Sequence, residues 1–198
     1  MDRQTLIDAP RELHTTRLVM HAPKAEFAAP FVESLNLSLP GLTFISWGQN
    51  AKTLEWAQRF VGGGLAYVDS GEDLIFYAFE RDTGAYVGRV DLHSWDFRTP
   101  RCEVGYVGDV RTAGRGLMRE AVLACVNLAF GLGAARVQAL SEADNQHALR
   151  FAEVSLGFTR EGVLRHYERD AQGRLGEQVM FAAYPPVLPS NIKGNAAT

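Results

Sequence analysis

The chain has 198 residues, of which 46% are hydrophobic and 22% are charged, and it carries a formal net charge of −3 at pH 7. A chain of this length and composition can bury one sizeable hydrophobic core, as ordinary globular proteins do. The slightly negative charge gives no reason to expect nucleic acid as a partner, because nucleic-acid binding usually demands a basic surface.

The sequence shows no pattern typical of a membrane span or a secretion signal. The longest apolar run, residues 121–135, is interrupted by Asn127 and is too short for a bilayer. Residues 1–4 lead into no long apolar segment. The two cysteines, Cys102 and Cys125, form no close-spaced pair and no metal pattern with histidine, so we interpret them as buried free thiols and expect no metal. These features predict a cytoplasmic protein.

The N-terminal third is predicted to hold one strand and two helices. Residues 1–14 are expected to be a flexible arm, and the first strand is expected over residues 15–21. A helix over residues 24–35 starts near a proline, which fits the first turn of a helix. Asn50 is expected to cap a second helix, whose apolar residues recur at helical spacing at Leu54, Ala57, Phe60 and Val61. We interpret Gly62-Gly63-Gly64 as the end of that helix followed by a flexible link.

Three strands of an antiparallel meander are predicted next. Residues 73–81 and 85–95 are rich in β-branched and aromatic side chains, and the turn sequence Asp82-Thr83-Gly84 separates them. A loop through Pro100 leads to a third strand, residues 102–110, which we expect at the centre of the sheet. Consecutive antiparallel strands need no crossover helix.

The junction between this central strand and the following helix is predicted to bind an anion. Gly114 and Gly116 stand where the helix begins. The first turn of a helix has unpaired N–H groups and the positive end of the helix dipole, and glycine lets a ligand come close to the main chain. Arg111, Arg115 and Arg119 add positive charge. The dinucleotide-binding fingerprint and the P-loop are both excluded, because the third glycine of the former and the Gly-Lys-Ser/Thr of the latter are missing.

The rest of the chain is predicted to complete the sheet. The helix over residues 116–130 has its polar residues in one narrow arc, so most of its surface is expected to be buried. Residues 136–141 are expected to form a strand parallel to the central one, because a helix joins the two. A short helix follows over residues 145–156, and then a hairpin of strands at 161–169 and 177–184.

Three motifs fall in register without a gap, namely Glu103-Val104-Gly105-Tyr106, Gly114-Arg115-Gly116 and Glu120-Ala121. This arrangement resembles the GNAT superfamily of acetyl-CoA-dependent N-acetyltransferases, and within it the RimJ/RimL type, the ribosomal-protein N-acetyltransferases. Two further segments agree with that type: Thr15-Thr16-Arg17-Leu18, and the series Asn145, Gly157-Phe158 and Glu161-Gly162.

The resemblance implies a fold and a division of the chain. The fold is α/β (α+β), with a mixed, mostly antiparallel sheet of about seven strands flanked by helices and a splay between the fourth and fifth strands. A single domain would span residues 15–184, and residues 185–198 would be a disordered tail. The helices ahead of the main sheet would form the acceptor side of a cleft. Trp47 and Trp56 either line that side or belong to the core, as large aromatic residues more often do.

The resemblance also implies how acetyl-CoA is bound. The main chain of residues 111–117 would hold the diphosphate, and the pantetheine arm would lie between the central strand and residues 136–141. Backbone N–H groups near Tyr106–Gly108 would face the thioester oxygen as oxyanion donors. Asn145 would either hydrogen-bond the cofactor arm or cap its own helix. The complete set expected to bind the cofactor is Val107, Gly108, Val110, Arg111, Ala113, Gly114, Arg115, Gly116, Leu117, Ser141 and Asn145.

Glu103 and Tyr106 are the expected catalytic residues, with Glu103 as the candidate general base and Tyr106 at the oxyanion site. Members of the superfamily use a glutamate at the position of Glu103, directly or through water. The alternative is a structural carboxylate paired with Arg101 or another cation. Asp91, His93 and His166 are further candidates for the base, although a lone histidine on a strand is usually structural.

The sequence departs from the family at the position of the general acid. Many members have a tyrosine in the last helix, but residues 149–153 contain none, and Ala148 stands where the RimJ/RimL type often has a serine. The leaving thiol would therefore be protonated by water or by another group. Because these residues are missing, a non-catalytic regulatory module that binds CoA is an alternative function for the chain.

The identity of the acceptor is left with two alternatives. Deprotonating a lysine amine at pH 7 costs about 4–5 kcal/mol, whereas an α-amine costs about 1 kcal/mol. A weak or water-relayed base therefore favours the N-terminal α-amine of a protein or peptide, as the resemblance does. The alternative acceptor is a small molecule such as an amino acid, a polyamine or a drug. We expect the protein to act as a monomer or a homodimer.

Overall fold

The computed structural model describes residues 1–45, 50–169 and 173–186. Within these residues the strands form one sheet in the order β1-β2-β3-β4-β5-β6-β8-β7, and β5–β6 is its one parallel pair. The strands are β1 (Glu12–His14), β2 (Leu18–His21), β3 (Leu74–Glu80), β4 (Tyr86–Asp96), β5 (Arg101–Gly108), β6 (Arg136–Glu142), β7 (Thr159–Arg169) and β8 (Leu175–Ala183). The expected mixed, mostly antiparallel sheet is confirmed, with eight strands in place of about seven.

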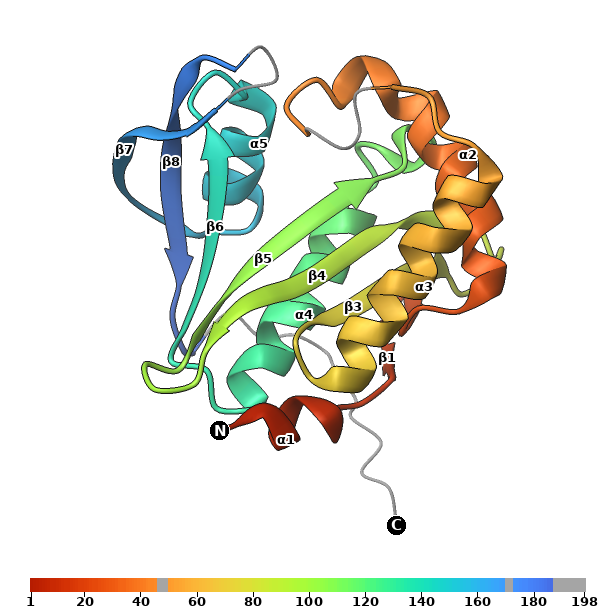
Figure 1. Ribbon diagram of the computed structural model, residues 1–198, viewed down its shortest axis with the longest axis horizontal. Coiled ribbons are helices and arrows are strands. Elements are labelled where there is room, and N and C mark those ends of the chain that lie inside the picture. The colour runs from red at the N-terminus through yellow and green to blue at the C-terminus, as the bar shows by residue number, and fades with distance from the viewer. Residues whose placement is uncertain (46–49, 170–172, 187–198) are drawn as a thin grey trace.

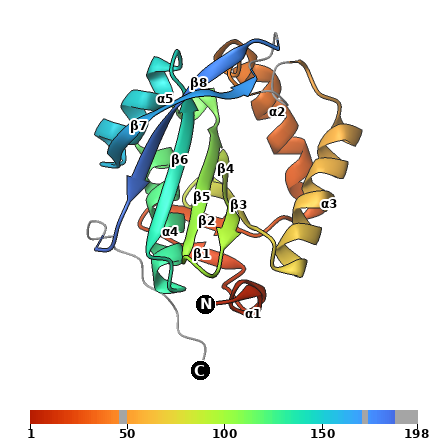
Figure 2. The same cartoon turned by 60° about the vertical axis from the view of Figure 1, so that its left-hand side comes forward.

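Helices cover both faces of this sheet, α4 and α5 on one face and α2 and α3 on the other (Figures 1 and 2). The helices are α1 (Arg3–Ile7), α2 (Ala28–Ser38), α3 (Leu54–Ser70), α4 (Leu117–Gly131) and α5 (Gln146–Arg150), which continues as a π-helical turn over Phe151–Ser155. Short 3₁₀ turns are η1 (Ala25–Phe27), η2 (Leu39–Gly41) and η4 (Val110–Thr112). Among the described residues, no helix is both long enough and apolar enough to span a bilayer.

The prediction of a flexible arm over residues 1–14 is wrong. Asp2 caps α1 with a capping box, and Leu6 of that helix is fully buried. Residues 12–14 form β1, which pairs with β2 and is the additional strand of the sheet. The short polar segments hid these elements from sequence reasoning, because Leu6 and Leu13 gain their burial only from contacts with distant parts of the chain. The expected disorder of the tail stays a prediction, since residues 187–198 lie outside the described part of the chain.

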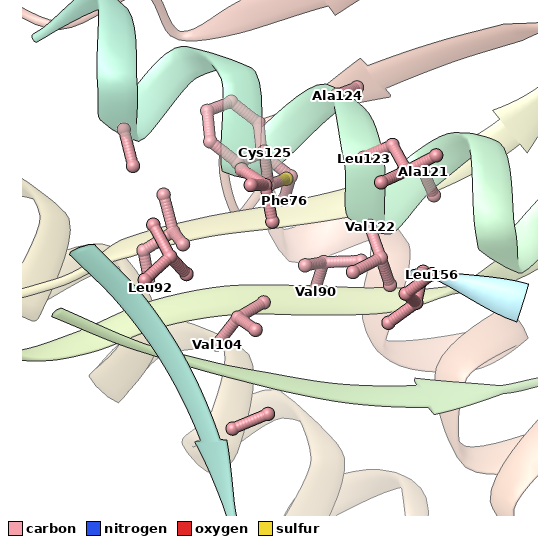
Figure 3. Close-up of a cluster of buried hydrophobic side chains, with 14 of the residues drawn as sticks. Phe76, Val90, Leu92, Val104, Ala121, Val122, Leu123, Ala124, Cys125 and Leu156 are labelled. Atoms are coloured by element: carbon pink, nitrogen blue, oxygen red, sulfur yellow. The ribbon is translucent and has the colours of Figure 1, made fainter. Parts of the chain in front are cut away.

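Helix α4 is the central element of the larger core. It lies across the sheet with Val122, Cys125 and their neighbours facing Val90, Leu92 and Val104 (Figure 3). Most of its circumference is buried, as its composition predicts. Cys102 and Cys125 are both buried free thiols in this core, and burial raises the pKa of the Cys102 thiol to about 12. Both cysteines are therefore packing residues.

Helix α3 differs from the prediction at both of its ends. Its N-cap is Thr53, whose hydroxyl accepts a hydrogen bond from the backbone N–H of Trp56 at 3.2 Å, so the predicted cap Asn50 lies outside the helix. The interpretation of Gly62-Gly63-Gly64 as a helix end is also wrong, because the three glycines lie within α3. Trp56 stacks on Phe60, in the cluster formed with α2, as the core interpretation predicts. Trp47 lies outside the described residues.

The glycines of α3 give a stability prediction. A Cβ added at Gly62 or Gly63 would meet no atom within 4 Å, and both residues are exposed. We expect Gly62→Ala and Gly63→Ala each to raise the free energy of unfolding by about 0.5–1 kcal/mol, because alanine loses less backbone entropy in a helix. Gly64→Ala is the matched control, since its Cβ would lie 3.2 Å from Ile75 Cδ1 and the gain should be smaller. Urea unfolding measures all three, and no gain at Gly62 or Gly63 would contradict the prediction.

The sheet splits between β5 and β6. The two strands pair in parallel only at Arg101–Glu103 with Arg136–Gln138. Beyond that point β6 stays paired with β8 as far as Glu142, while β5 stays paired with β4 as far as Gly108. The predicted splay is confirmed, and Glu103 and Gln138 are the last pair before the strands separate.

Candidate active site

A cleft of about 520 Å³ occupies the split between β5 and β6. Residues 103–107 of β5 form one wall, and residues 140–142 of β6 form the other, together with Asn145 and Ala148. The cleft continues on the α2/α3 face of the sheet to Phe60 and a group of charged residues on β4. The sequence placed Glu103, Tyr106, Val107, Ser141 and Asn145 in a site, and all five line this cleft.

The main chain after β5 provides free hydrogen-bond donors. The N–H groups of Val110, Arg111, Thr112 and Ala113 already bond to acceptors within the protein. From residue 114 to residue 119, no acceptor for a backbone N–H is found among the described residues. Gly116 is the N-cap of α4, with a φ of 73° and no side-chain cap. We call this run of free amides the amide cradle (residues 114–119). Residues 113–116 are exposed, so an anion can approach the cradle at its N-terminal part.

The arginines around the amide cradle have partners within the protein. Arg111 binds the buried Asp109 through its Nη2 at 2.6 Å, and its Nη1 lies 2.7 Å from Glu33 on α2. Burial alone would raise the pKa of Asp109, but the hydrogen bonds from Arg111 lower it. Arg115 is paired with Glu80. Of the three arginines Arg111, Arg115 and Arg119, Arg119 is the one without a carboxylate partner among the described residues; its Nε donates to the carbonyl of Ser155 at 2.6 Å.

Two strand glycines fix the position of the helix that carries the cradle. A Cβ at Gly108 would lie 2.7 Å from Met118 Cγ, and one at Gly88 would lie 2.4 Å from Met118 Sδ. The Met118 side chain thus packs directly on the backbones of β4 and β5. Gly108, Val110 and Leu117 are all predicted from the sequence to bind the cofactor. In the structure Gly108 has this packing role, Leu117 is fully buried, and Val110 is 54% exposed.

Glu103 lies at the vertex of the split. Its Oε2 accepts a long hydrogen bond from Gln138 of β6 at 3.4 Å, and its Oε1 lies 3.6 Å from Nε2 of His93, its cross-strand partner on β4. The side chain is 19% exposed. The predicted alternative partner, Arg101, pairs instead with Asp96. Glu103 is therefore held on both sides and still reaches the cleft.

A chain of alternating charges leads away from Glu103 along β4. Arg89, Asp91 and His93 lie at alternate positions of the strand and so share one face. Asp91 contacts Nδ1 of His93 at 2.7 Å through Oδ2 and pairs with Arg89 through Oδ1. Gly105 lies opposite Asp91, and a Cβ there would come within 2.9 Å of the carboxylate. The missing side chain makes room for the buried Asp91.

The electrostatics of this charged chain fix the protonation of His93. Burial alone would lower its pKa, but the contacts with Asp91 and Glu103 raise the pKa of His93 to about 10. Burial would likewise raise the pKa of Asp91, but Arg89 and His93 lower it. A protonated His93 cannot accept a proton, and His166 is exposed and does not line the cleft. Of the carboxylates and histidines predicted as bases, Glu103 is thus the best placed.

The predicted residues Tyr106 and Asn145, which line the cleft, also have structural roles. Tyr106 points to the α4 side of the sheet, where its ring lies 5.3 Å from that of Phe151, and burial raises the pKa of its hydroxyl to about 12. Asn145 caps α5 by accepting the N–H of Ala148 at 3.1 Å through Oδ1. Its Nδ2 has no acceptor among the described residues, so capping leaves a donor at the cleft.

The family is now decided by comparison with known proteins. Residues 17–159 match the model of an acetyltransferase (GNAT) domain. The chain belongs to the GNAT acetyltransferase family. It is therefore an acetyltransferase, and acetyl-CoA is the acetyl donor of the family. No curated protein matches this GNAT sequence.

Solved structures share the fold of this acetyltransferase at low sequence identity. The microcin C7 self-immunity acetyltransferase MccE, in complex with acetyl-CoA and AMP, has a TM-score of 0.78 and 17% identity, covering 86% of this chain and 93% of its own. RimL, the ribosomal L7/L12 α-N-protein acetyltransferase in complex with coenzyme A, has a TM-score of 0.77 and 19% identity, and the match covers 87% of this chain and 97% of RimL. The ribosomal-protein-S5-alanine acetyltransferase from Vibrio fischeri has a TM-score of 0.72 and 16% identity, and the match covers 90% of this chain and 99% of that enzyme.

The raised pKa of His93 predicts how stability changes with pH. Since the folded-state pKa of about 10 lies above the unfolded value, the ion pairs of His93 stabilise the fold fully below pH ~6.5, and this contribution is lost as pH rises through about 10. We expect His93→Gln to lower the free energy of unfolding by roughly 1–3 kcal/mol at low pH and by much less at high pH. Urea unfolding of both proteins from about pH 6 to pH 10 measures this, and a pH-independent difference would contradict it.

Proposed function

We propose that this acetyltransferase transfers the acetyl group of acetyl-CoA to the α-amine at the N-terminus of a protein or peptide. Two observations carry the proposal: Glu103 of β5 places a carboxylate at the vertex of the cleft, and the free main-chain amides of residues 114–119 follow the C-terminal end of the same strand. When bound, acetyl-CoA supplies a thioester carbonyl to be attacked. All other functions of the site come from the chain itself.

The free amides of the amide cradle would hold the diphosphate. These donors are main-chain groups at the start of a 15-residue helix, where the helix dipole also favours negative charge. The predicted contacts from Arg111 and Ala113 through their N–H groups are replaced by those beginning at Gly114, because the former are already bonded. The arm of the donor would lie in the split, along Val107 on one side and Ser141 on the other, with the free amide nitrogen of Asn145 as a donor.

Glu103 would accept the proton that the acceptor amine loses, directly or through one water molecule. The carbon–nitrogen bond forms as the carbon–sulfur bond breaks, and main-chain N–H groups near Tyr106–Gly108 would stabilise the charge that develops on the carbonyl oxygen. The thiolate then takes a proton from water or from the Tyr106 hydroxyl. The high pKa of Tyr106, about 12, keeps this hydroxyl protonated at neutral pH.

The chemical type of the candidate base supports an α-amine as the acceptor. Glu103 is a carboxylate, and carboxylates are weak bases at pH 7. A weak base suits an amine that needs only about 1 kcal/mol for deprotonation at pH 7 better than a lysine, which needs about 4–5 kcal/mol. RimL and the ribosomal-protein-S5 enzyme, whose names state protein acceptors, are consistent with this choice.

A small-molecule amine is the second candidate, since MccE, a microcin C7 self-immunity acetyltransferase whose name states no protein acceptor, is equally similar in fold. The test is a mass-spectrometric screen with acetyl-CoA of three matched sets: peptides with free N-termini, the same peptides with blocked N-termini and one internal lysine, and free amines such as amino acids and polyamines. We expect product with the first set only. Product with free amines alone would establish the second candidate.

A further inference from the structure

Arg17 reaches across the molecule to the amide cradle. It stands just before β2, about a hundred positions ahead of the loop, within the segment Thr15-Thr16-Arg17-Leu18 to which the proposed function gives no role. Its Nη1 donates to the carbonyl of Arg115 at 2.9 Å, and its Nη2 donates to the carbonyl of Gly116 at 3.2 Å. Its Nε bonds the carboxylate of Glu120 at 2.7 Å. These hydrogen bonds of the guanidinium all end on the loop and on the first turn of α4.

Because the peptide bond is planar, these contacts to carbonyls also fix the direction of the N–H groups in the same peptides. In a trans peptide the C=O and the N–H point in opposite directions. The carbonyls of Arg115 and Gly116 belong to the same peptide groups as the N–H groups of Gly116 and Leu117. With Arg17 bonded to the carbonyls, both N–H groups point away from it, and both are among the free donors of the cradle. A cation on the carbonyl side also polarises the peptide and strengthens its N–H as a donor.

Glu120 is held in the same arrangement. An acidic residue in the first turn of a helix usually turns back to the free N–H groups. Here its carboxylate accepts instead from the Thr15 hydroxyl at 2.5 Å, from the Arg17 backbone at 2.8 Å and from the Arg17 side chain. It is 19% exposed; burial alone would raise the pKa of Glu120, but the bonds from Thr15 and Arg17 lower it. Arg17 thus neutralises the charge of Glu120, and its bonds hold that carboxylate away from the amides.

We infer that Arg17 is a positioning residue for the diphosphate site: it fixes the cradle amides outward and compensates Glu120, without touching the ligand itself. The inference rests on the proposed function of the cradle. A loop held in its binding conformation before the ligand arrives loses less freedom on binding, so its contribution appears in the affinity for the donor. It is not expected to appear in the chemical step, because Arg17 lies outside the cleft.

The test compares Arg17→Met with the wild type in two measurements. We expect the Kd for coenzyme A, measured by calorimetry, and the KM for acetyl-CoA to rise about 10- to 100-fold, with kcat at saturating acetyl-CoA unchanged. Glu120→Gln leaves Arg17 on both carbonyls, so it should weaken binding no more than about threefold. Arg11→Met is the matched control, because it removes an exposed arginine pair, Arg11–Asp69 at 2.9 Å, remote from the cradle.

Arg17→Lys gives a second reading that does not depend on the methionine variant folding. Lysine keeps the charge near Glu120 but cannot bond two carbonyls and a carboxylate at once. The affinity of Arg17→Lys for coenzyme A should therefore lie between those of the wild type and Arg17→Met. Unchanged coenzyme A affinity in both Arg17 variants would overturn the inference. An equal loss of coenzyme A affinity in Glu120→Gln would also overturn it. So would a kcat of the Arg17 variants that falls together with their Tm. A wild-type protein that binds no coenzyme A would instead contradict the proposed function.

Discussion

Glu103→Gln is expected to lower kcat/KM for acetyl transfer by about 100-fold or more, the range typical for the loss of a general base. Glutamine keeps the size of the side chain and can still contact Gln138, but it accepts no proton at neutral pH. The affinity for coenzyme A should change little, because the cradle amides lie beyond the C-terminal end of β5. The measurement is the initial rate with the best acceptor of the screen from about pH 6 to pH 9, together with the Kd for coenzyme A.

The matched control for this change is Glu168→Gln. Glu168 also lines the cleft, but it lies on β7 and bonds Gln178, remote in the sheet from the vertex. Its replacement should alter the rate by less than about threefold, as an exposed carboxylate contributes little. A Glu103→Gln enzyme with the wild-type rate at every pH would show that another group, or water alone, takes the proton.

Gly114→Val is expected to weaken coenzyme A binding by about 100-fold or more. Gly114 has a φ of 76°, a conformation that costs an L-residue roughly 1–2 kcal/mol, and a branched side chain there would also cover the first free amides. Loss of donors and loss of access act together, so the effect on affinity should exceed the effect on stability. Calorimetry with coenzyme A and thermal unfolding of the free protein separate the two.

Gly133→Val provides a comparable backbone strain at the opposite end of α4 from the cradle. Gly133 has a φ of 105°, and a Cβ there would lie 3.6 Å from Met1 Cβ, an ordinary van der Waals contact. It follows the last residue of α4 by two positions, remote from the loop at the start of that helix. Both variants should therefore lose similar stability, and only Gly114→Val should lose affinity. Equal, wild-type affinity in the two would mean that the amides of this loop do not bind the diphosphate.

The charged chain along β4 could have been anticipated only in part. The spacing Arg89-x-Asp91-x-His93 puts three charged residues on one face of a strand, which is unusual for a central strand and was a usable signal. The sequence does not give the register between β4 and β5, however, and that register makes His93 the neighbour of Glu103. One residue of slip would send His93 to the opposite face and remove the ion pair.

The segment that holds Arg17 shows the same limit at longer range. Its resemblance to a family motif was visible, but its purpose depends on where β2 lies relative to α4. Burial of the first residues follows the same rule, because Leu6 is an isolated apolar residue until the rest of the core surrounds it. Interactions between segments a hundred residues apart leave no local periodicity to detect.

By itself the sequence determined the order of most helices and strands, the parallel step from β5 to β6, the anion-binding junction and the family. These depend on local spacing: alternation in strands, apolar rows in helices, and glycines where a helix begins. Only the tertiary structure decided which amides remain free, which carboxylates hold the arginines and what surrounds Glu103. Each of these is a question of partners, and partners are set by strand register and packing, which bring together residues that the chain keeps far apart.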